Sequence, residues 1–413
     1  MMFFSRKQPA KGRRRWLRLS VLLALGAILW FAIHQRDSRQ LARALTAMRA
    51  GPAEEKHLDG ITYQHYQFKD VPWSIHVVRI DRTRPDFELG TTLAQGTRIG
   101  LNTLSQQVRS VPPEAGQPRA AINGDFYQTE QRPVAGDPRG LQILRGELIS
   151  APGEMSCVWI DPFGRLAAGE VKSEFEITWP NGDRTPFGLN EAAGNKPAIL
   201  YTAAMGDMAG SSRAMEFVLE NTQGGKFPPL EAGQTVTARI RTIHHEGKTR
   251  PTGDTLLLSM DNPNSGALAA KAGDTISIST ATQPGLKGVR TAVGGGPVLL
   301  HRAEVQSCRA RRSGERHPRS AIGWNKTELF FVQVDGRQPS LSIGMSLPEL
   351  AKFMLQLPCD EAMNLDGGGS AEVWMDGKVL NSPCYGYERK TANGIVLLQK
   401  ARPGREGSED EID

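Results

Sequence analysis

The sequence contains only 4 cysteines in 413 residues, and none of them stands in a CxxC pair or at zinc-ligand spacing from a histidine. It also lacks a P-loop, an HExxH motif and a recognisable Ser-His-Asp pattern. The sequence therefore predicts neither a zinc site nor a P-loop nucleotide site, and it establishes no cofactor. A divalent cation near Asp125 and Asp366 stays open as an alternative.

Positive charge is concentrated at the N-terminus and is not spread over the chain. The formal net charge is +6, but seven cations precede the first acid, Asp37, so the rest of the chain carries −1. A nucleic-acid footprint needs basic patches on the folded body, and the sequence therefore argues against a nucleic-acid partner. The seven cations are Arg6, Lys7, Lys11, Arg13, Arg14, Arg15 and Arg18.

An apolar run from Leu19 to Ile33 follows these cations. With Leu17 it approaches the roughly 17 residues that can span a bilayer, and the order of basic then apolar residues favours a cytoplasmic N-terminus. We therefore expect a single-pass inner-membrane anchor with the folded domain in the periplasm. A cleaved signal peptide is the alternative, although small residues at a cleavage spacing occur only at Ala42 and Ala44.

The few cysteines suit an exported protein, in which disulfides can form. Cys359 and Cys384 flank a glycine-rich motif and could be linked. A free thiol at each of the four positions, which include Cys157 and Cys308, is the alternative.

The content of 44 glycines and 26 prolines predicts many turns and a β-rich chain. Short strand-like runs recur from Ile61 onward, whereas the clearest helix is 346–357. Ser346 and Glu349 form a capping box there, and one apolar face follows. We predict an α+β fold of mixed β-sheets with a few helices. The apolar face consists of Leu347, Leu350, Met354 and Leu357.

The expected organisation has four parts. Residues 1–34 would be the basic N-terminus and anchor, 35–57 a helical or flexible linker, 58–400 a single folded domain, and 401–413 a disordered acidic tail. Within the domain, 164–289 is expected to be a β-rich elaboration. The sequence shows no internal repeat.

The stretch NLDGGGSAEVW, residues 364–374, has an acid at the end of a strand-like run, followed by three glycines. Three glycines in succession are costly to order, so the chain has a use for bare backbone there. Bare amides in such a turn can form a concave anion site, beside which Asp366 would lie. The acid and the anion would repel each other unless a proton, a cation or a substrate with both sugar and phosphate lies between them. A glycine-rich hairpin turn with a structural aspartate is the alternative.

Together with three further motifs, this stretch resembles the phosphodiester glycosidase family. The similarity runs from Tyr63 to Gln399 in the family's motif order and ends with ERKTANGIVL, residues 388–397. Where the family commonly has NGGFF, residues 123–127 are NGDFY, so this chain carries an additional carboxylate, Asp125. The further motifs are AAINGDFY (120–127), AVGGGPVLL (292–300) and HPRSAIGW (317–324).

The resemblance implies cleavage of a sugar–phosphate diester at the anomeric carbon, which passes through an oxocarbenium-like state and uses carboxylates. Asp366 is the predicted catalytic carboxylate, as nucleophile, base or stabiliser of the cation. Asp125 and Glu372 are its candidate partners, each of which could instead be structural. Asn123 and Asn364 would bind sugar hydroxyls or, alternatively, stabilise turns.

Phosphate favours the planar fork of arginine. Arg319 and Arg389 stand where the family has matching arginines, and we predict that they hold the phosphate. We expect the triple glycines 294–296 and 367–369 to meet in one cleft with Asn123. The remaining predicted binding residues are Gly295, Gly296, Gly367, Gly368, Gly369 and Ser370.

These features predict an exported glycosidase that hydrolyses a glycosyl phosphodiester in cell-envelope or exopolysaccharide metabolism. Its partners would be a glycan or sugar-phosphate substrate and, through the anchor, a membrane. A non-hydrolytic glycan-binding protein of the envelope and a glycosyl or phosphoglycosyl transferase are the alternatives.

Overall fold

The computed structural model of the chain describes residues 51–129, 135–192, 194, 196–208, 215–245, 247, 249, 252–308 and 313–401, with a few residues between 39 and 48. The chain divides into two units. One consists of Met1–Gly51 with Phe68–Val71, and the other of Pro52–Gln67 with Pro72–Asp413. The sheets and the helices α2, α3 and α4 belong to the second unit, and strands predominate in it, as predicted.

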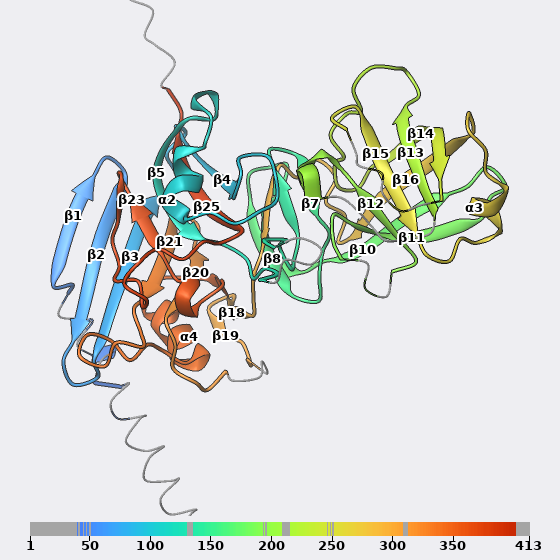
Figure 1. Cartoon of the computed structure of the whole chain (residues 1–413). Coiled ribbons are helices and arrows are strands. Elements are labelled where there is room, and N and C mark those ends of the chain that lie inside the picture. Colours follow the sequence, from blue (N-terminus) through green and yellow to red (C-terminus); the bar gives the residue numbers. More distant parts are fainter. Residues whose placement is uncertain are drawn as a thin grey trace, which may run out of the picture. The chain divides into compact units, whose positions relative to one another are not determined.

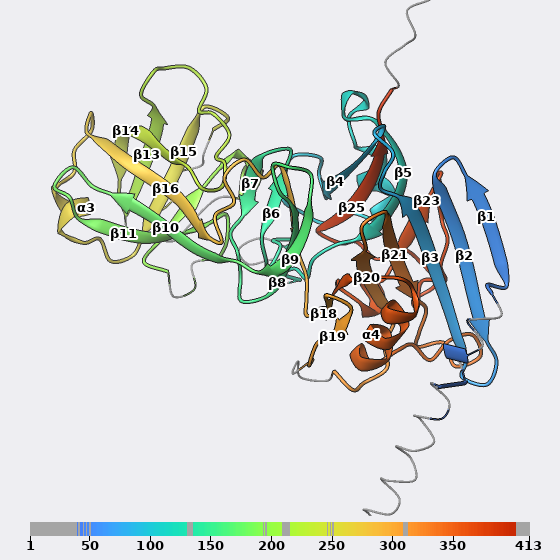
Figure 2. The same ribbon diagram turned by 180° about the vertical axis from the view of Figure 1, so that it is seen from behind.

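The largest sheet has eight strands, and Figure 2 shows its first three side by side. The central strands β3 and β21 bury nearly every residue, and their sequences are rich in β-branched and aromatic residues. In order, the strands are β1 (Glu54–Leu58), β2 (Ile61–Phe68), β3 (Trp73–Asp81), β21 (Glu328–Val334), β20 (Arg319–Trp324), β22 (Glu361–Asn364), β18 (Val298–His301) and β19 (Glu304–Val305).

A second sheet packs against the first through a shared apolar core. Ile122, Val373 and Ile395 of the second sheet are buried in one cluster with Val78 and Phe331 of the first. This packing holds the ends of strands from both sheets close together. The strands are, in order, β24 (Lys378–Val379), β23 (Val373–Met375), β5 (Gln117–Asn123), β25 (Asn393–Gln399) and β4 (Phe87–Leu93).

A third sheet contributes one strand end to the site. Val158 and Val293 of this sheet join the core of the first two sheets. The order of its strands is β7 (Glu147–Ser150), β6 (Gln142–Leu144), β17 (Thr291–Gly294), β8 (Ser156–Ile160) and β9 (Leu166–Glu170).

Seven strands form a closed barrel within residues 172–283, coloured green to yellow in Figure 1. Alternating residues such as Phe175, Ile177 and Ile278 fill its interior. Only β11 and β12 pair in parallel among the strand pairs resolved in the described part of the barrel. The order is β10 (Lys172–Thr178), β11 (Arg184–Leu189), β12 (Ala198–Tyr201), β15 (Thr255–Met260), β13 (Met215–Asn221), β14 (Thr235–His244) and β16 (Thr275–Gln283).

The described helices are short. Helix α4 (Leu347–Gln356) has the predicted capping box, because the Ser346 hydroxyl accepts from the Glu349 amide and the Glu349 side chain accepts from Ser346. Its buried face is the predicted one. Helix α2 (Leu104–Arg109) covers the second sheet with Leu104 and Val108, and α3 (Ser265–Ala269) begins at the Asn264 cap.

The prediction of a single-pass inner-membrane protein is contradicted. Residues 1–34, the predicted anchor, lie outside the described residues. Within the part of the chain that the structure describes, no helix is long and apolar enough to cross a bilayer, and the longest named helix, α4, has 10 residues. A span needs about 20.

The structure also differs from two smaller predictions, the end of the linker and the link between Cys359 and Cys384. Residues 54–57, the end of the expected linker, belong to strand β1, whose backbone pairs with β2 although every side chain is exposed. All four cysteines are free thiols, so Cys359 and Cys384 are not linked. The predicted tail beyond residue 401 lies outside the described residues.

Candidate active site

Strand ends from all three sheets meet at the glycine-rich motifs. The Asp366 amide donates to the Gly124 carbonyl at 2.9 Å, and the Gly296 amide donates to the Asn364 carbonyl at 2.7 Å. The Asn123 side-chain amide donates to the Asp366 carbonyl at 2.7 Å. The two triple-glycine segments and Asn123 therefore belong to one hydrogen-bonded assembly.

Asp366 follows β22 and is partly buried. Its Oδ1 accepts from the Gly367 amide at 2.9 Å. Burial raises the pKa of this carboxyl to about 6, although the Ser370 hydroxyl, the Gly367 amide and the cations Arg389 and Arg139 act in the opposite direction. The carboxyl therefore titrates close to neutral pH while it remains accessible.

Asp125 follows β5 by two residues and is fully buried. Its Oδ2 accepts from the Gly140 amide at 2.7 Å, and its Oδ1 has no hydrogen-bond partner. Burial, and to a smaller extent the nearby Asp366 carboxyl, raise the pKa of Asp125 to about 7, against the influence of the backbone amides and Arg139. The two acids are therefore electrostatically coupled.

The first triple glycine makes room for this buried acid. A Cβ on Gly294 would overlap the Asp125 carboxylate, and one on Gly295 would lie 2.9 Å from the Asn364 carbonyl oxygen. Gly294 and Gly295 therefore need to be glycine, because the Asp125 carboxylate and the Asn364 carbonyl lie where a Cβ would be. Gly296 has a φ of +114°, which also favours glycine.

Two arginines and a tyrosine surround the acids. Arg389 lies over the ring of Tyr127, with 5.6 Å between the guanidinium carbon and the ring centroid. The Tyr127 hydroxyl donates to the Lys390 carbonyl at 2.9 Å, which fixes the segment that carries Arg389. Ser370 lies beside both the Tyr127 hydroxyl and the Asp366 carboxyl. This arrangement places Arg389 where it acts on Asp366.

Both asparagines hold strands together. Asn123 Oδ1 accepts from the Ser320 hydroxyl at 2.6 Å and from the Glu372 amide at 3.0 Å. Asn364 is 2% exposed, and its side-chain amide donates to the Gly296 carbonyl at 2.8 Å. These contacts support the structural alternative for both residues over direct contact with a sugar.

Arg319 lies next to the second glycine turn, where a Cβ on Gly367 would lie 3.7 Å from its Cα. Its Nε and Nη2 donate to the Met345 and Glu315 carbonyls at 2.8 Å, which uses two of the five N–H groups of a guanidinium. Burial, together with the nearby Arg337 guanidinium, lowers the pKa of Arg319 to about 10. The Gly368 amide donates to the Pro318 carbonyl at 2.9 Å and ties the turn to this arginine's strand.

The Glu372 carboxyl faces the Glu388 carboxyl, with which it shares a hydrogen bond. Glu372 is 3% exposed and its Oε1 has no partner. Burial, together with the charge of Glu388 and a hydrogen bond with it, raises the pKa of Glu372 to about 9. Glu388 in turn accepts from the Ser105 amide and hydroxyl at 3.2 and 2.9 Å. The structure therefore pairs Glu372 with a different acid from the one expected.

Sequence reasoning missed Arg139, Arg337 and Asn393. Asn393 Oδ1 accepts from the Asp125 amide at 2.8 Å, and a Cβ on Gly124 would overlap it. Asn393 lies within the ERKTANGIVL motif, which could have drawn attention to it. Arg337 follows the turn signal Asp335-Gly336, whereas nothing local marks the exposed Arg139.

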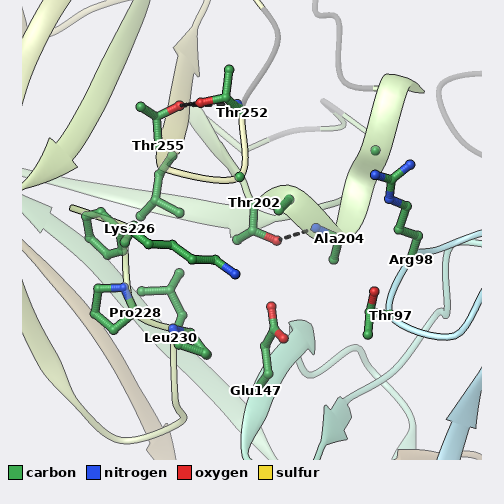
Figure 3. A pocket seen from close by; sticks show the side chains of 16 residues that line it. Thr97, Arg98, Glu147, Thr202, Ala204, Lys226, Pro228, Leu230, Thr252 and Thr255 are labelled. Carbon is green, nitrogen blue, oxygen red and sulfur yellow. Dashed lines mark hydrogen bonds between the residues drawn. The ribbon is translucent and has the colours of Figure 1, made fainter. Parts of the chain in front are cut away.

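No group of three or more His, Cys, Asp or Glu that could hold a metal ion occurs among the described residues. A cavity of about 470 Å³, into which Glu147 and Lys226 point, lies beside the barrel and contains none of the motif residues (Figure 3). The candidate active site is therefore defined by the motifs and not by that cavity.

Comparison with known proteins gives matches over different parts of the chain. A stretch of 83 residues, 20% of this chain, is 34% identical to the SPbeta prophage-derived uncharacterized protein YomE of Bacillus subtilis (strain 168), of which it covers 13%. The chain thus spans a small part of that relative.

Two crystal structures have a similar fold. One is a hypothetical protein from Synechocystis, with a TM-score of 0.66 and 20% identity, over 84% of this chain and 64% of that one. The other is a protein from Burkholderia pseudomallei K96243, with a TM-score of 0.58 and 20% identity, over 79% and 74%. At this identity the likeness concerns the fold alone.

Residues 230–398 match the family model described as phosphodiester glycosidase. The matched segment contains Asp366, Arg319 and Arg389, whereas Asp125 and Arg139 precede it. The match supports a glycosidase-type function in general terms. The resemblance seen in the sequence is therefore confirmed over residues 230–398, and the AAINGDFY motif (120–127) lies outside the matched segment.

Proposed function

We propose that this chain hydrolyses a glycosyl phosphodiester with Asp366 and Asp125 as its catalytic carboxyls. The observation that supports this most is the coupled pair of acids with raised pKa values beside the cations Arg389 and Arg139. Acids whose environments separate their pKa values are suited to divide acid and base roles at neutral pH. Here Asp366 has the lower pKa and Asp125 the higher.

In the proposed reaction, the bond between the anomeric carbon and the phosphate oxygen breaks, and its electron pair leaves with the phosphate. Asp366, as the ionised group, faces the anomeric carbon as nucleophile or as base for the water that replaces the phosphate. Asp125 holds the proton that the site retains near pH 7. A phosphate leaves readily, so protonation of the leaving group contributes less than for a sugar leaving group.

The arginines bind the anionic phosphate on this proposal. Arg389 is held over Tyr127 at the acids, and among the described residues the Arg319 guanidinium is bonded through Nε and Nη2, which leaves Nη1 for a ligand at the glycine turn. Fork-shaped guanidinium donors suit phosphate oxygens. The products would be a free sugar and a phosphate monoester.

The test measures sugar release from methyl phosphodiesters of glucose, mannose and N-acetylglucosamine 1-phosphates. Asp366→Asn keeps the shape and removes the charge, so turnover should fall by at least about 100-fold, the scale of a lost positioned catalytic group. Asp254→Asn, which changes an exposed aspartate of the barrel region, serves as the control.

Both variants must first give the circular dichroism spectrum of the folded protein. If wild type releases no sugar from any diester, or if Asp366→Asn turns over normally, the proposed function is wrong. The anomeric configuration of the first product, followed by NMR, distinguishes attack by Asp366 from attack by water.

A further inference from the structure

Two exposed tyrosines stand on the loop between β24 and β25. Tyr385 is 51% exposed and Tyr387 66% exposed. Their rings stack, with centroids 6.1 Å apart and an angle of 29° between the planes. They are among the few large exposed apolar side chains in the described chain. A stacked pair in this position presents a broad aromatic face to solvent.

The loop that carries these rings is anchored on buried groups. The Ser382 amide donates to Oδ1 of the buried Asp335 at 3.0 Å. Gln338 forms two hydrogen bonds with Ser382. Its side-chain amide donates to the Ser382 carbonyl at 2.9 Å, and its side-chain oxygen accepts from the Ser382 hydroxyl at 3.0 Å. Asn381 accepts from the Val373 amide at 3.0 Å. The tyrosines therefore project from a fixed support.

The aromatic face is continuous with the candidate active site. A Cβ on Gly369 would overlap the Tyr385 ring, and one on Gly368 would lie 3.0 Å from the Arg337 guanidinium. Arg337 Nη1 lies 3.5 Å from the Tyr385 hydroxyl. Both glycines belong to the turn that begins at Asp366. The bare backbone of this turn thus allows the ring and the cation to lie directly against it.

We propose that Tyr385, Tyr387 and Arg337 form a binding subsite for the sugar residues attached to the phosphate. This rests on the proposed function, and it assigns the substrate to glycans that carry the phosphodiester on a chain of sugars. The C–H faces of sugar rings are apolar and pack on aromatic rings, and the stacked pair extends the contact beyond one ring. Arg337 supplies a cation for the phosphate or for hydroxyls at the near end.

A glycan fits the observations better than a small alkyl phosphate. The aromatic face lies outside the glycine turn, so only a group that extends past the phosphate reaches both rings. The surface combines aromatic rings with a cation, as an anionic sugar chain requires.

The test compares binding of methyl phosphate with binding of 6-phosphorylated trisaccharides of glucose, mannose and N-acetylglucosamine by calorimetry. Binding needs no turnover, so the result does not depend on whether the chain is a hydrolase. Each ring is expected to contribute about 3- to 10-fold. Combining Tyr385→Ala with Tyr387→Ala should thus weaken trisaccharide-phosphate binding by at least about 10-fold more than methyl phosphate binding.

Two further variants make the result specific. Tyr385→Phe keeps the ring and should retain most of the trisaccharide affinity. Phe163→Ala removes another exposed ring, which lies beside Arg165 on a different hairpin, and should leave both ligands unaffected. The proposal is overturned if no trisaccharide phosphate binds more tightly than methyl phosphate, or if the double variant weakens both ligands equally.

Discussion

Replacing Glu372 by glutamine should remove a large part of the pH dependence of stability. Glu372 is buried against Glu388, and its pKa is raised to about 9 because both burial and the neighbouring carboxyl oppose ionisation. The ordinary value for the unfolded chain is 4.5. Between these two values the folded state keeps a proton that the unfolded state has lost, so the free energy of unfolding falls as pH rises.

The size of the effect follows from the two pKa values. Each pH unit within this window costs about 1.4 kcal/mol, so the loss from pH 5 to pH 8 is about 4 kcal/mol, as an order of magnitude. Glutamine resembles the protonated acid, because its amide can donate toward Glu388 as the carboxyl proton does. It does not titrate. The variant should therefore match wild type near pH 5 and exceed it increasingly toward pH 8.

The assay is urea unfolding followed by tryptophan fluorescence at pH 5, 6, 7 and 8. Glu114→Gln is the control, because Glu114 is exposed and its replacement should leave the pH dependence as in wild type. Parallel stability curves for Glu372→Gln and wild type would show that this carboxyl is ionised in the folded protein, and the reasoning would be refuted.

Two further predictions concern the coupled acids. Gly294→Ala places a methyl group against the Asp125 carboxylate, so urea unfolding should show a loss of about 1–3 kcal/mol, whereas Gly285→Ala, with open space around it, should not. The pH profile of kcat/KM for sugar release should rise through about pH 6 as Asp366 ionises and fall above about pH 7 as Asp125 loses its proton. Asp125→Asn should lower the rate and remove the fall above pH 7. An unchanged alkaline limb in that variant would exclude Asp125 as its source.

Local signals predicted part of the fold. The capping box at Ser346 fixes where α4 begins, and the apolar run at 328–334 becomes the central strand β21, because both depend on neighbours in the sequence. Strand β1 has no such signal, since its five side chains are exposed and it is held by backbone pairing with β2 and by exposed side-chain contacts such as Gln64 to Glu55. Closure of the barrel pairs Lys172 with Gln283. No local pattern predicts this pairing, because the two residues are far apart in the sequence.

The motifs identified the residues of the site better than their roles. Asp366 and Asp125 come together because strand ends of different sheets converge, and Asp366 accordingly bonds to Gly124 through its backbone. Asn123 is conspicuous in the sequence, yet its amide is used by Asp366, Ser320 and Glu372. Arg337 has no motif of its own, and only the fold brings it to Gly368.

Binding of a phosphate monoester at pH 7 should draw a proton into the site. Asp366 already raises the pKa of Asp125, and a second anion beside these acids would raise it further. A group with a pKa of about 7 is half protonated at that pH, so uptake of up to about 0.5 proton is expected. This uptake would let a site with two acids accept an anion, because in the bound state Asp125 would be neutral in nearly every molecule, whereas in the free state it is neutral in about half of them.

Calorimetric titration of methyl phosphate in two buffers that differ in ionisation enthalpy, such as Tris and PIPES, measures the uptake. Wild type and Asp254→Asn should show an observed enthalpy that depends on the buffer, whereas Asp125→Asn should lose most of this dependence. An enthalpy that is independent of buffer in wild type would mean that Asp125 keeps its charge when the anion binds. The arginines would then have to offset both acids and the phosphate. Arg389 and Arg139 act on the two acids, which leaves Arg319 and Arg337 for the phosphate, and the entry of a proton lowers the negative charge that these cations must offset.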